Sequence, residues 1–434
     1  DYDEWRQKGC TGWDYDSVLP FFRKAENQTR GEDEFHGVGG PLTVSDQPAT
    51  SELTEALIDA AEQAGIPRNP DFNGARQEGA GYYQTTTSNR RRWSTAKAYL
   101  EPAKGRPNLT IRTLCQATRV LIEEGRATGV EYRSPRGIET ARAQREVIVS
   151  GGAYGSPQLL MLSGLGPAAH LQEMGIAVQR DMPAVGANLH DHFGLYMQWR
   201  CTRPITFNDF EKSWPRKIAA AAQYALTRSG PMAVNGIRAG LFTRTDPRLE
   251  RPDLQINLLE WSTQERSATR VRAHPFPGFT LCPVHLTPDG RGTVRLGSSD
   301  PFAAPVITFG FLGSDYDMRA MVEGAKLARR LVQQPALAPL AGEELFPGPG
   351  CASDADLERC VRDSGLTNHH PAGSCAMGTG TNSVVDPRLR VHGVGGLRVA
   401  DASIMPAVVA GNTNAPSIMI GEKCAAMVLE DAAA

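Results

Sequence analysis

The chain has 434 residues and a formal net charge of −2, and 41% of its residues are hydrophobic. This is the composition of a globular protein with room for two or three domains, and it excludes disordered and fibrous classes. The balanced charge gives no reason to expect a nucleic-acid partner, and no apolar run approaches the roughly 18 residues of a membrane span.

Helical patterns dominate the first part of the chain. Residues 13–26 predict a short helix with Val18 and Phe22 on its apolar side. Residues 51–64 predict an amphipathic helix with Ser51 as its N-cap, and Gly65 followed by Pro67 ends it.

Strands follow in the next part. Residues 108–133 alternate as in a β-meander, with its first strand expected at N-L-T-I-R-T. The apolar run E-V-I-V-S at 146–150 leads into a glycine turn at 151–157 and then a helix. That order is how α/β folds bring a helix N-terminus against a phosphate-bearing ligand, although it also occurs as simple packing.

The pattern of predicted elements changes at residue 194. The stretch 194–345 predicts a second domain with an antiparallel sheet and helices, including a strand at G-R-G-T-V-R-L and a helix over 315–332. Its large aromatic side chains are expected in the core more often than in a pocket. They are Trp199, Phe207, Trp214 and Trp261. A strand at 396–401 and a C-terminal helix end the chain.

A histidine in a turn is the first candidate for chemistry. His370 lies in N-H-H-P-A-G-S-C-A-M-G, where the loop rather than an apolar helix face would hold its side chain. Such an imidazole can act as a general base near neutral pH, and the alternative is a hydrogen-bonded structural histidine.

A second candidate region precedes the last helix. Asp401 and Ala402 end a strand, and Asn412 and Thr413 lie just before Pro416. Pro near a helix start, with Asn and Thr before it, indicates N-terminal capping. A helix N-terminus carries partial positive charge that suits an anionic ligand. Capping accounts for Asn414 and Pro416 and leaves Asn412 without a task.

His190 and His192 could both point toward a metal from a strand, but no further ligand follows at a suitable spacing. We therefore expect loop or solvent contacts for both and no metal site. The eight cysteines are scattered, which favours reduced thiols and a cytoplasmic location.

Taken together, these segments resemble the glucose–methanol–choline (GMC) family of flavin oxidoreductases over nearly the whole chain. The resemblance is carried by the opening D-Y-D-E-W-R-Q-K-G-C-T-G-W-D-Y-D-S-V-L-P-F-F, by R-R-W-S-T-A-K-A-Y-L, and by G-A-Y-G-S-P-Q-L-L-M-L-S-G-L-G. It continues in H-P-A-G-S-C-A-M-G and in A-D-A-S-I-M-P followed by G-N-T-N-A-P.

The resemblance implies an α/β fold with an FAD-binding three-layer domain and an α+β substrate domain. The FAD-binding domain would comprise 1–40, 100–193 and 384–434, with a covering or lid segment at 41–99 and a substrate-binding domain at 194–383. It implies His370 as the catalytic base and Asn412 as the second catalytic residue. The implied FAD contacts are Val120, Ala153, Ser156, Asp401, Ala402 and Thr413.

The expected activity is FAD-dependent oxidation of an alcohol to an aldehyde or ketone, with quinone or oxygen as electron acceptor. The family pattern opens with a strand, a G-x-G-x-x-G turn and a helix, and this sequence opens after them. We therefore expect an incomplete FAD-binding domain that, alone, holds FAD weakly. The alternatives are a hydroxynitrile lyase of the same architecture and a flavin-free remnant. The sequence does not identify the alcohol or the oligomeric state.

Overall fold

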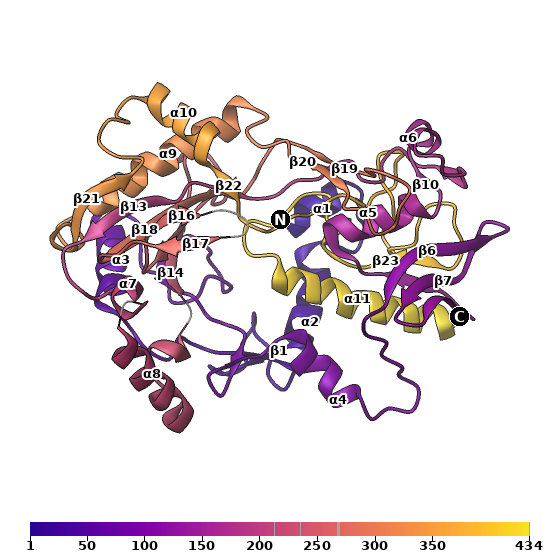
Figure 1. The fold of residues 1–434 in the computed structure, drawn as a ribbon, viewed down its shortest axis with the longest axis horizontal. Coiled ribbons are helices and arrows are strands. Elements are labelled where there is room, and N and C mark those ends of the chain that lie inside the picture. Colours follow the sequence, from indigo (N-terminus) through magenta and orange to yellow (C-terminus); the bar gives the residue numbers. More distant parts are fainter. Residues whose placement is uncertain (212, 235, 267–269, 434) are drawn as a thin grey trace.

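The computed structural model describes residues 1–211, 213–234, 236–266 and 270–433. Figure 1 shows helices and sheets in two groups, with the largest sheet under α9 on one side and the C-terminal helix on the other. The helices are α1 (Tyr2–Gln7), α2 (Tyr15–Ala25), α3 (Glu52–Gln63), α4 (Glu101–Ala103), α5 (Gly152–Leu162), α6 (Ala168–Glu173), α7 (Phe207–Glu211), α8 (Trp214–Thr227), α9 (Asp315–Val332), α10 (Asp354–Ser364) and α11 (Asn414–Ala433).

The largest sheet, called the main sheet here, is antiparallel. Its strands run in the order β21 (Ala341–Phe346), β13 (Met197–Cys201), β18 (Gly278–His285), β15 (Leu254–Leu259), β14 (Ile237–Thr243) and β3 (Gly79–Tyr82). Two short strands, β12 (Phe193–Gly194) and β22 (Leu366–Thr367), pair beside β18. The expected antiparallel sheet of the second domain is therefore present.

Two smaller sheets lie in the other group. The strands β6 (Gln116–Glu123), β7 (Arg126–Ser134) and β8 (Gly137–Arg142) form a meander, and β9 (Val147–Val149) pairs in parallel with β23 (Leu397–Val399). Two-stranded pairs complete the described strands: β1 (Glu26–Gln28) with β2 (Leu42–Val44), β4 (Thr87–Ser88) with β5 (Arg91–Arg92), β10 (Leu165–Gly166) with β11 (Arg180–Asp181), β16 (Thr263–Arg266) with β17 (Val271–Ala273), and β19 (Thr293–Arg295) with β20 (Val306–Thr308).

Two hydrophobic cores correspond to the two groups. The first joins Trp5 and Trp13 of the N-terminal segment to Leu160 of α5 and Met419 of α11. The second packs α3, α9 and α10 against one face of the main sheet. Since side chains alternate along strands, the other face of the main sheet carries a separate, smaller apolar cluster that includes Phe242, Leu259 and Cys282.

The structure confirms most of the expected elements. Ser51 caps α3 through the Thr54 amide, and α9 spans the expected residues. The expected strand at 108–113 is wrong: this segment forms no strand and leaves Leu109 and Ile111 exposed, and the third strand of the meander is β8, which pairs with β7. Trp199 is buried as expected, whereas Trp214 is 76% exposed. No helix among the described residues is long and apolar enough to cross a bilayer.

Candidate active site

The backbone around His370 is held by the segment 190–192. His190 and Ala372 exchange both backbone hydrogen bonds, at 3.1 and 2.9 Å. Asp191 Oδ1 accepts a hydrogen bond from the His370 amide at 2.8 Å, and its other oxygen accepts from the Thr367 hydroxyl. Gly373 has φ of +88°, and a Cβ there would collide with the His190 ring. These contacts fix the turn that carries His370.

A second histidine lies directly behind the first. His192 Nδ1 is 2.9 Å from His370 Nδ1, and His192 Nε2 is 3.1 Å from the Leu286 carbonyl oxygen. The carbonyl can only accept, so His192 carries its proton on Nε2 and its lone pair on Nδ1. That lone pair then accepts from His370 Nδ1–H. The arrangement leaves the lone pair of His370 on Nε2.

Asn412 meets His370 at that second nitrogen. Asn412 Nδ2 is 3.0 Å from His370 Nε2, which fits an amide N–H donating to the imidazole lone pair. His370 is 8% exposed, whereas Asn412 is exposed. The Nε2 side of the imidazole is therefore the side from which a small molecule can approach.

The loop before α11 is anchored by residues from distant parts of the chain. Trp5 Nε1 donates to the Ala407 carbonyl at 2.9 Å, and Asp1 accepts from the Ala410 amide at 2.8 Å. Gln77 donates from Nε2 to the Ala410 carbonyl. Asn412 follows two residues later, so these contacts set its position.

Burial keeps both histidines neutral. It lowers the pKa of His370 to about 4, with a smaller contribution from the neighbouring His369. Burial also lowers the pKa of His192 well below its ordinary value, followed by the effect of His370. A neutral pair agrees with the tautomers that the hydrogen bonds require, and it leaves His370 ready to accept a proton.

Five of the six residues implied as FAD contacts lie at the junction of α5, β23 and α11. The sixth, Val120, lies in β6. The Asp401 carboxylate accepts from the Gly152 amide at 2.9 Å and from the Ser156 hydroxyl. Ala153 is 4% exposed, and Ala402 and Thr413 are half-buried. Val120 is buried in β6, where its amide donates to the Ser163 hydroxyl at 2.8 Å. Ser156 and Asp401 therefore bond to each other, and contacts with a ligand would fall to the backbone around them.

The backbone at this junction is open to a ligand, and the start of α11 favours an anionic one. Gly152, Gly155 and Gly421 each have open space where a Cβ would lie. The N-terminus of α11 has no acidic residue in its first turn, so its partial positive charge is not neutralised there. Bare glycines and an unneutralised helix end are features that suit an anionic, flavin-like group.

The sequence singled out His192 only as a possible metal ligand and did not place it, or Asp191, beside His370. Loop or solvent contacts were expected for His192: its partners, His370 and the Leu286 carbonyl, do lie in loops, but the side chain is fully buried from solvent. The pairing of β12 with β18 and β22 brings these residues to His370. Strands of two residues, such as β12 and β22, are too short to be recognised from a sequence pattern. Among the described residues, no group of His, Cys, Asp and Glu could hold a metal ion.

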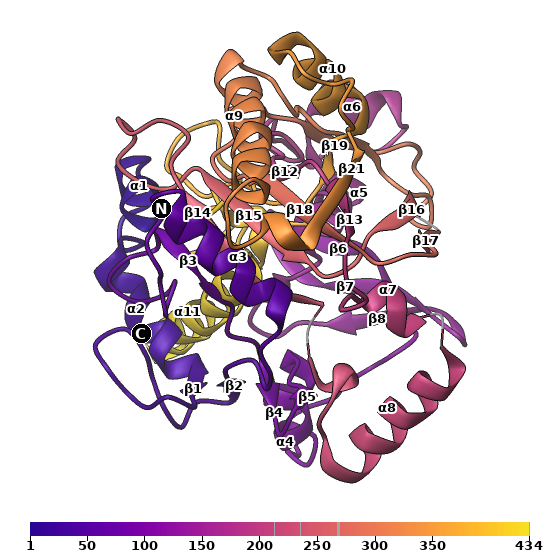
Figure 2. The same cartoon turned by 90° about the vertical axis from the view of Figure 1, so that its left-hand side faces the viewer.

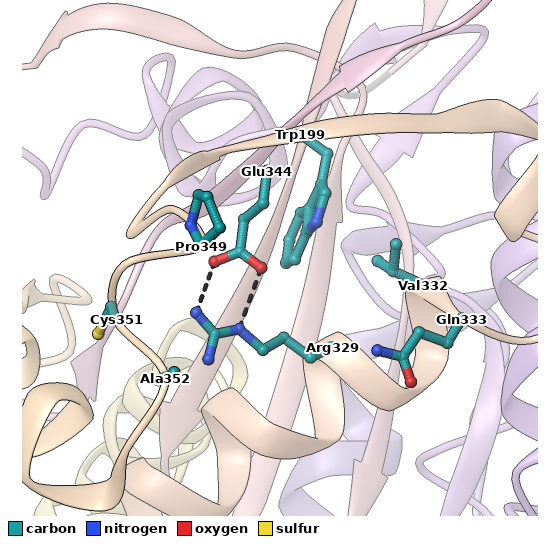
Figure 3. A pocket seen from close by; sticks show the side chains of 8 residues that line it. All are labelled: Trp199, Arg329, Val332, Gln333, Glu344, Pro349, Cys351 and Ala352. Atoms are coloured by element: carbon teal, nitrogen blue, oxygen red, sulfur yellow. Dashed lines mark hydrogen bonds and ion pairs between the residues drawn. The ribbon is translucent and has the colours of Figure 1, made fainter.

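A separate cavity of about 290 Å³ lies beside α9 and β21 (Figure 3). Arg329 and Glu344, both in its lining, form a bidentate ion pair at 3.0 and 2.7 Å. Trp199 forms part of its wall. Since the two charged groups neutralise each other, we place the candidate site at His370 and not here.

Comparisons with family profiles and with individual proteins point to the same family. The sequence profile of GMC oxidoreductases matches residues 1–194 and 288–421. A protein named oxygen-dependent choline dehydrogenase from Rhizobium johnstonii is 41% identical over 431 residues, covering 99% of this chain and 78% of that protein. Its namesake from Burkholderia ambifaria is 42% identical over 428 residues, covering 98% and 75%.

Solved structures agree with the sequence relatives. Pyridoxine 4-oxidase from Mesorbium loti superposes with a TM-score of 0.88 at 27% identity, covering 99% of this chain and 80% of that one. Formate oxidase from Aspergillus oryzae, from a study of FAD modification, gives 0.90 at 27% identity with the same coverage. The chain belongs to the GMC oxidoreductase family.

Proposed function

We propose that the protein oxidises a primary or secondary alcohol to an aldehyde or ketone, with His370 as general base and Asn412 as hydrogen-bond donor. FAD-dependent oxidation of a CH–OH group is the activity that the family and its relatives support. The observation that carries the assignment of residues is the 3.0 Å contact between His370 Nε2 and Asn412 Nδ2. One acceptor and one donor then converge on the same point.

The two side chains have complementary tasks. A substrate hydroxyl that replaces their direct hydrogen bond would donate its proton to His370 Nε2 while its oxygen accepts from Asn412 Nδ2–H. Loss of the proton places negative charge on the oxygen, and the amide stabilises that charge without competing for the proton. When bound, FAD supplies the acceptor for the hydride that leaves the carbinol carbon.

The surrounding residues orient the pair and hold the cofactor. His192 fixes the His370 tautomer, and Asp191 fixes its backbone. The backbone around Gly152 and Gly155 and the first turn of α11 would hold FAD, the latter near Asn412. The charge that develops in the reaction is thus met by donors that are in place before the substrate binds.

Oxygen or a quinone would complete the reaction as electron acceptor. The relatives named above carry oxygen dependence and choline in their names. We therefore propose choline as the first alcohol to test, followed by uncharged alcohols of similar size.

The test is alcohol-dependent reduction of an artificial acceptor by FAD-loaded protein. We expect His370→Ala to lower turnover by about two to four orders of magnitude, and Asn412→Ala by about one to three. Near-normal turnover of His370→Ala would remove this residue from the mechanism. Cyanohydrin cleavage without acceptor reduction would instead show a lyase.

A further inference from the structure

The face of the main sheet that is turned away from α3 and α9 carries a small apolar cluster, called the inner cluster here. Figure 2 shows α3 and α9 in front of the main sheet and α11 behind it, so this face is turned toward the part of the molecule that contains α11. The buried members of the inner cluster come from β14, β15 and β18 and from two adjoining loops. They are Phe242, Leu259, Cys282, Val284, Leu286 and Ala410.

Two members of the inner cluster belong to the segments that hold the candidate catalytic pair. The Leu286 carbonyl accepts from His192 Nε2 at 3.1 Å, directly behind His370. Ala410 lies two residues before Asn412 in the loop that leads to α11. The inner cluster is therefore next to the point where His370 Nε2 and Asn412 Nδ2 meet. A substrate whose hydroxyl binds at that point has its carbon chain close to this cluster.

The polar side chains on the same face are uncharged. Gln255 and Asn257 project from β15 on the side opposite the larger core. Gln255 Nε2 donates to the Tyr83 hydroxyl at 3.0 Å, and this hydroxyl donates to Asn257 Oδ1 at 2.8 Å. Glu260 follows β15 but belongs to the other side, where it accepts from the Thr54 hydroxyl of α3 at 2.8 Å. The described side chains of the inner cluster and of this network therefore carry no charge.

The aromatic rings at the inner cluster pack against one another. The ring centroid of Phe72 is 5.5 Å from that of Tyr83 and 5.0 Å from that of Phe242. Phe242 meets both other rings edge to face. A cage for a quaternary ammonium instead turns several ring faces toward one cation, each within about 6 Å. These three rings thus form an apolar surface and not a cage.

Such a surface discriminates against charge. Transfer of a cation from water to an apolar surface costs free energy unless a counter-charge or an aromatic cage compensates for it, whereas a neutral group of the same shape gains free energy. We propose that the protein prefers an uncharged alcohol with an apolar body to choline, and that the inner cluster is the surface that holds this body. The inference rests on the proposed alcohol oxidation and selects among the alcohols named there.

The test compares choline with its carbon analogue, in which a tert-butyl group of the same shape replaces the trimethylammonium group. Steady-state oxidation of both compounds by FAD-loaded protein gives kcat/KM, and isothermal titration calorimetry gives their dissociation constants. We expect kcat/KM for the carbon analogue to be at least about tenfold higher than that for choline. Equal values, or a higher value for choline, would overturn the proposal.

The binding measurement separates this inference from the proposed function. Tighter binding of the carbon analogue without oxidation of either compound would contradict the proposed alcohol oxidation and still support the preference for an uncharged body. Equal or tighter binding of choline would contradict that preference whatever the turnover. Binding of neither compound would overturn both.

The variant Asn257→Asp supplies the missing charge with almost no change of shape. The Tyr83 hydroxyl can still donate to the new carboxylate, and a carboxylate shielded from water attracts a cation strongly. At about pH 8, where the carboxyl group is ionised, the ratio of kcat/KM for choline to that for the carbon analogue should rise at least about tenfold.

The matched control is Asn108→Asp, which adds the same charge at an exposed position before β6. It should leave the ratio unchanged. An unchanged ratio in Asn257→Asp as well would show that the substrate does not lie against the inner cluster, which would refute the inference.

Discussion

Replacing His192 tests whether it sets the tautomer of His370. In His192→Leu the Nδ1–H of His370 loses its buried acceptor, which costs about 1–3 kcal/mol. The molecule avoids this cost by moving the proton to Nε2, where the lone pair that should accept the substrate proton is lost. At 1.36 kcal/mol per factor of ten, the reactive fraction falls about 5- to 160-fold. We expect kcat to fall by that factor with little change in KM.

The assay is steady-state alcohol oxidation with an artificial acceptor, with thermal unfolding as the check on folding. His192→Asn is the matched variant, because its amide oxygen can accept from His370 Nδ1–H in place of the imidazole nitrogen. It should recover most of kcat. A leucine variant within twofold of the unmodified protein would refute the tautomer argument, and so would an asparagine variant as slow as the leucine variant.

Two further predictions concern pH. Because burial lowers the pKa of His370 to about 4, its neutral form persists in acid, and the acid limb of the kcat/KM profile should lie near pH 4; a limb near 6.5 would contradict this. Hydrogen bonds to Asp71 and then Glu26 raise the pKa of His36 to about 10. The folded state therefore holds a proton that the unfolded state releases above about pH 6.5. This stabilisation, roughly 2–4 kcal/mol, is complete below that pH and disappears as pH rises through 10. Chemical denaturation from pH 6 to 10 should show the decline, and His36→Gln should flatten it.

Local signals in the sequence predicted the elements well where side chains near in sequence decide the outcome. Ser51 and Gly65 mark the ends of α3, because capping and helix termination depend on one or two residues. The third strand of the meander is β8, not the expected segment 108–113. Alternation along a segment does not show which other segment it pairs with. The outward orientation of α8 was also hidden, because periodicity shows that a helix has an apolar side but not what covers it.

The candidate site was predictable in part for the same reason. The turn around His370 and the helix start near Asn412 can each be identified from nearby residues, and the structure brings the two side chains to 3.0 Å. Their catalytic roles stay a prediction. The contact between His192 and His370 joins positions 178 residues apart. It depends on the pairing of β12 with β18 and β22, strands that are far apart in the sequence. Nothing within either segment encodes it.

A histidine behind the proposed base, His370, has a consequence that a carboxylate would not have. An anionic partner would raise the pKa of the base, as Asp71 and Glu26 do for His36. The neutral His192 orients His370 without adding charge, so the base stays unprotonated far below neutral pH. A base with so low a pKa has little driving force to remove a hydroxyl proton unless the oxygen left behind is stabilised. In the proposed mechanism that stabilisation comes from Asn412 and from the N-terminus of α11, and the contacts of Trp5 and Gln77 hold the loop between Ala407 and Asn412 in place for it.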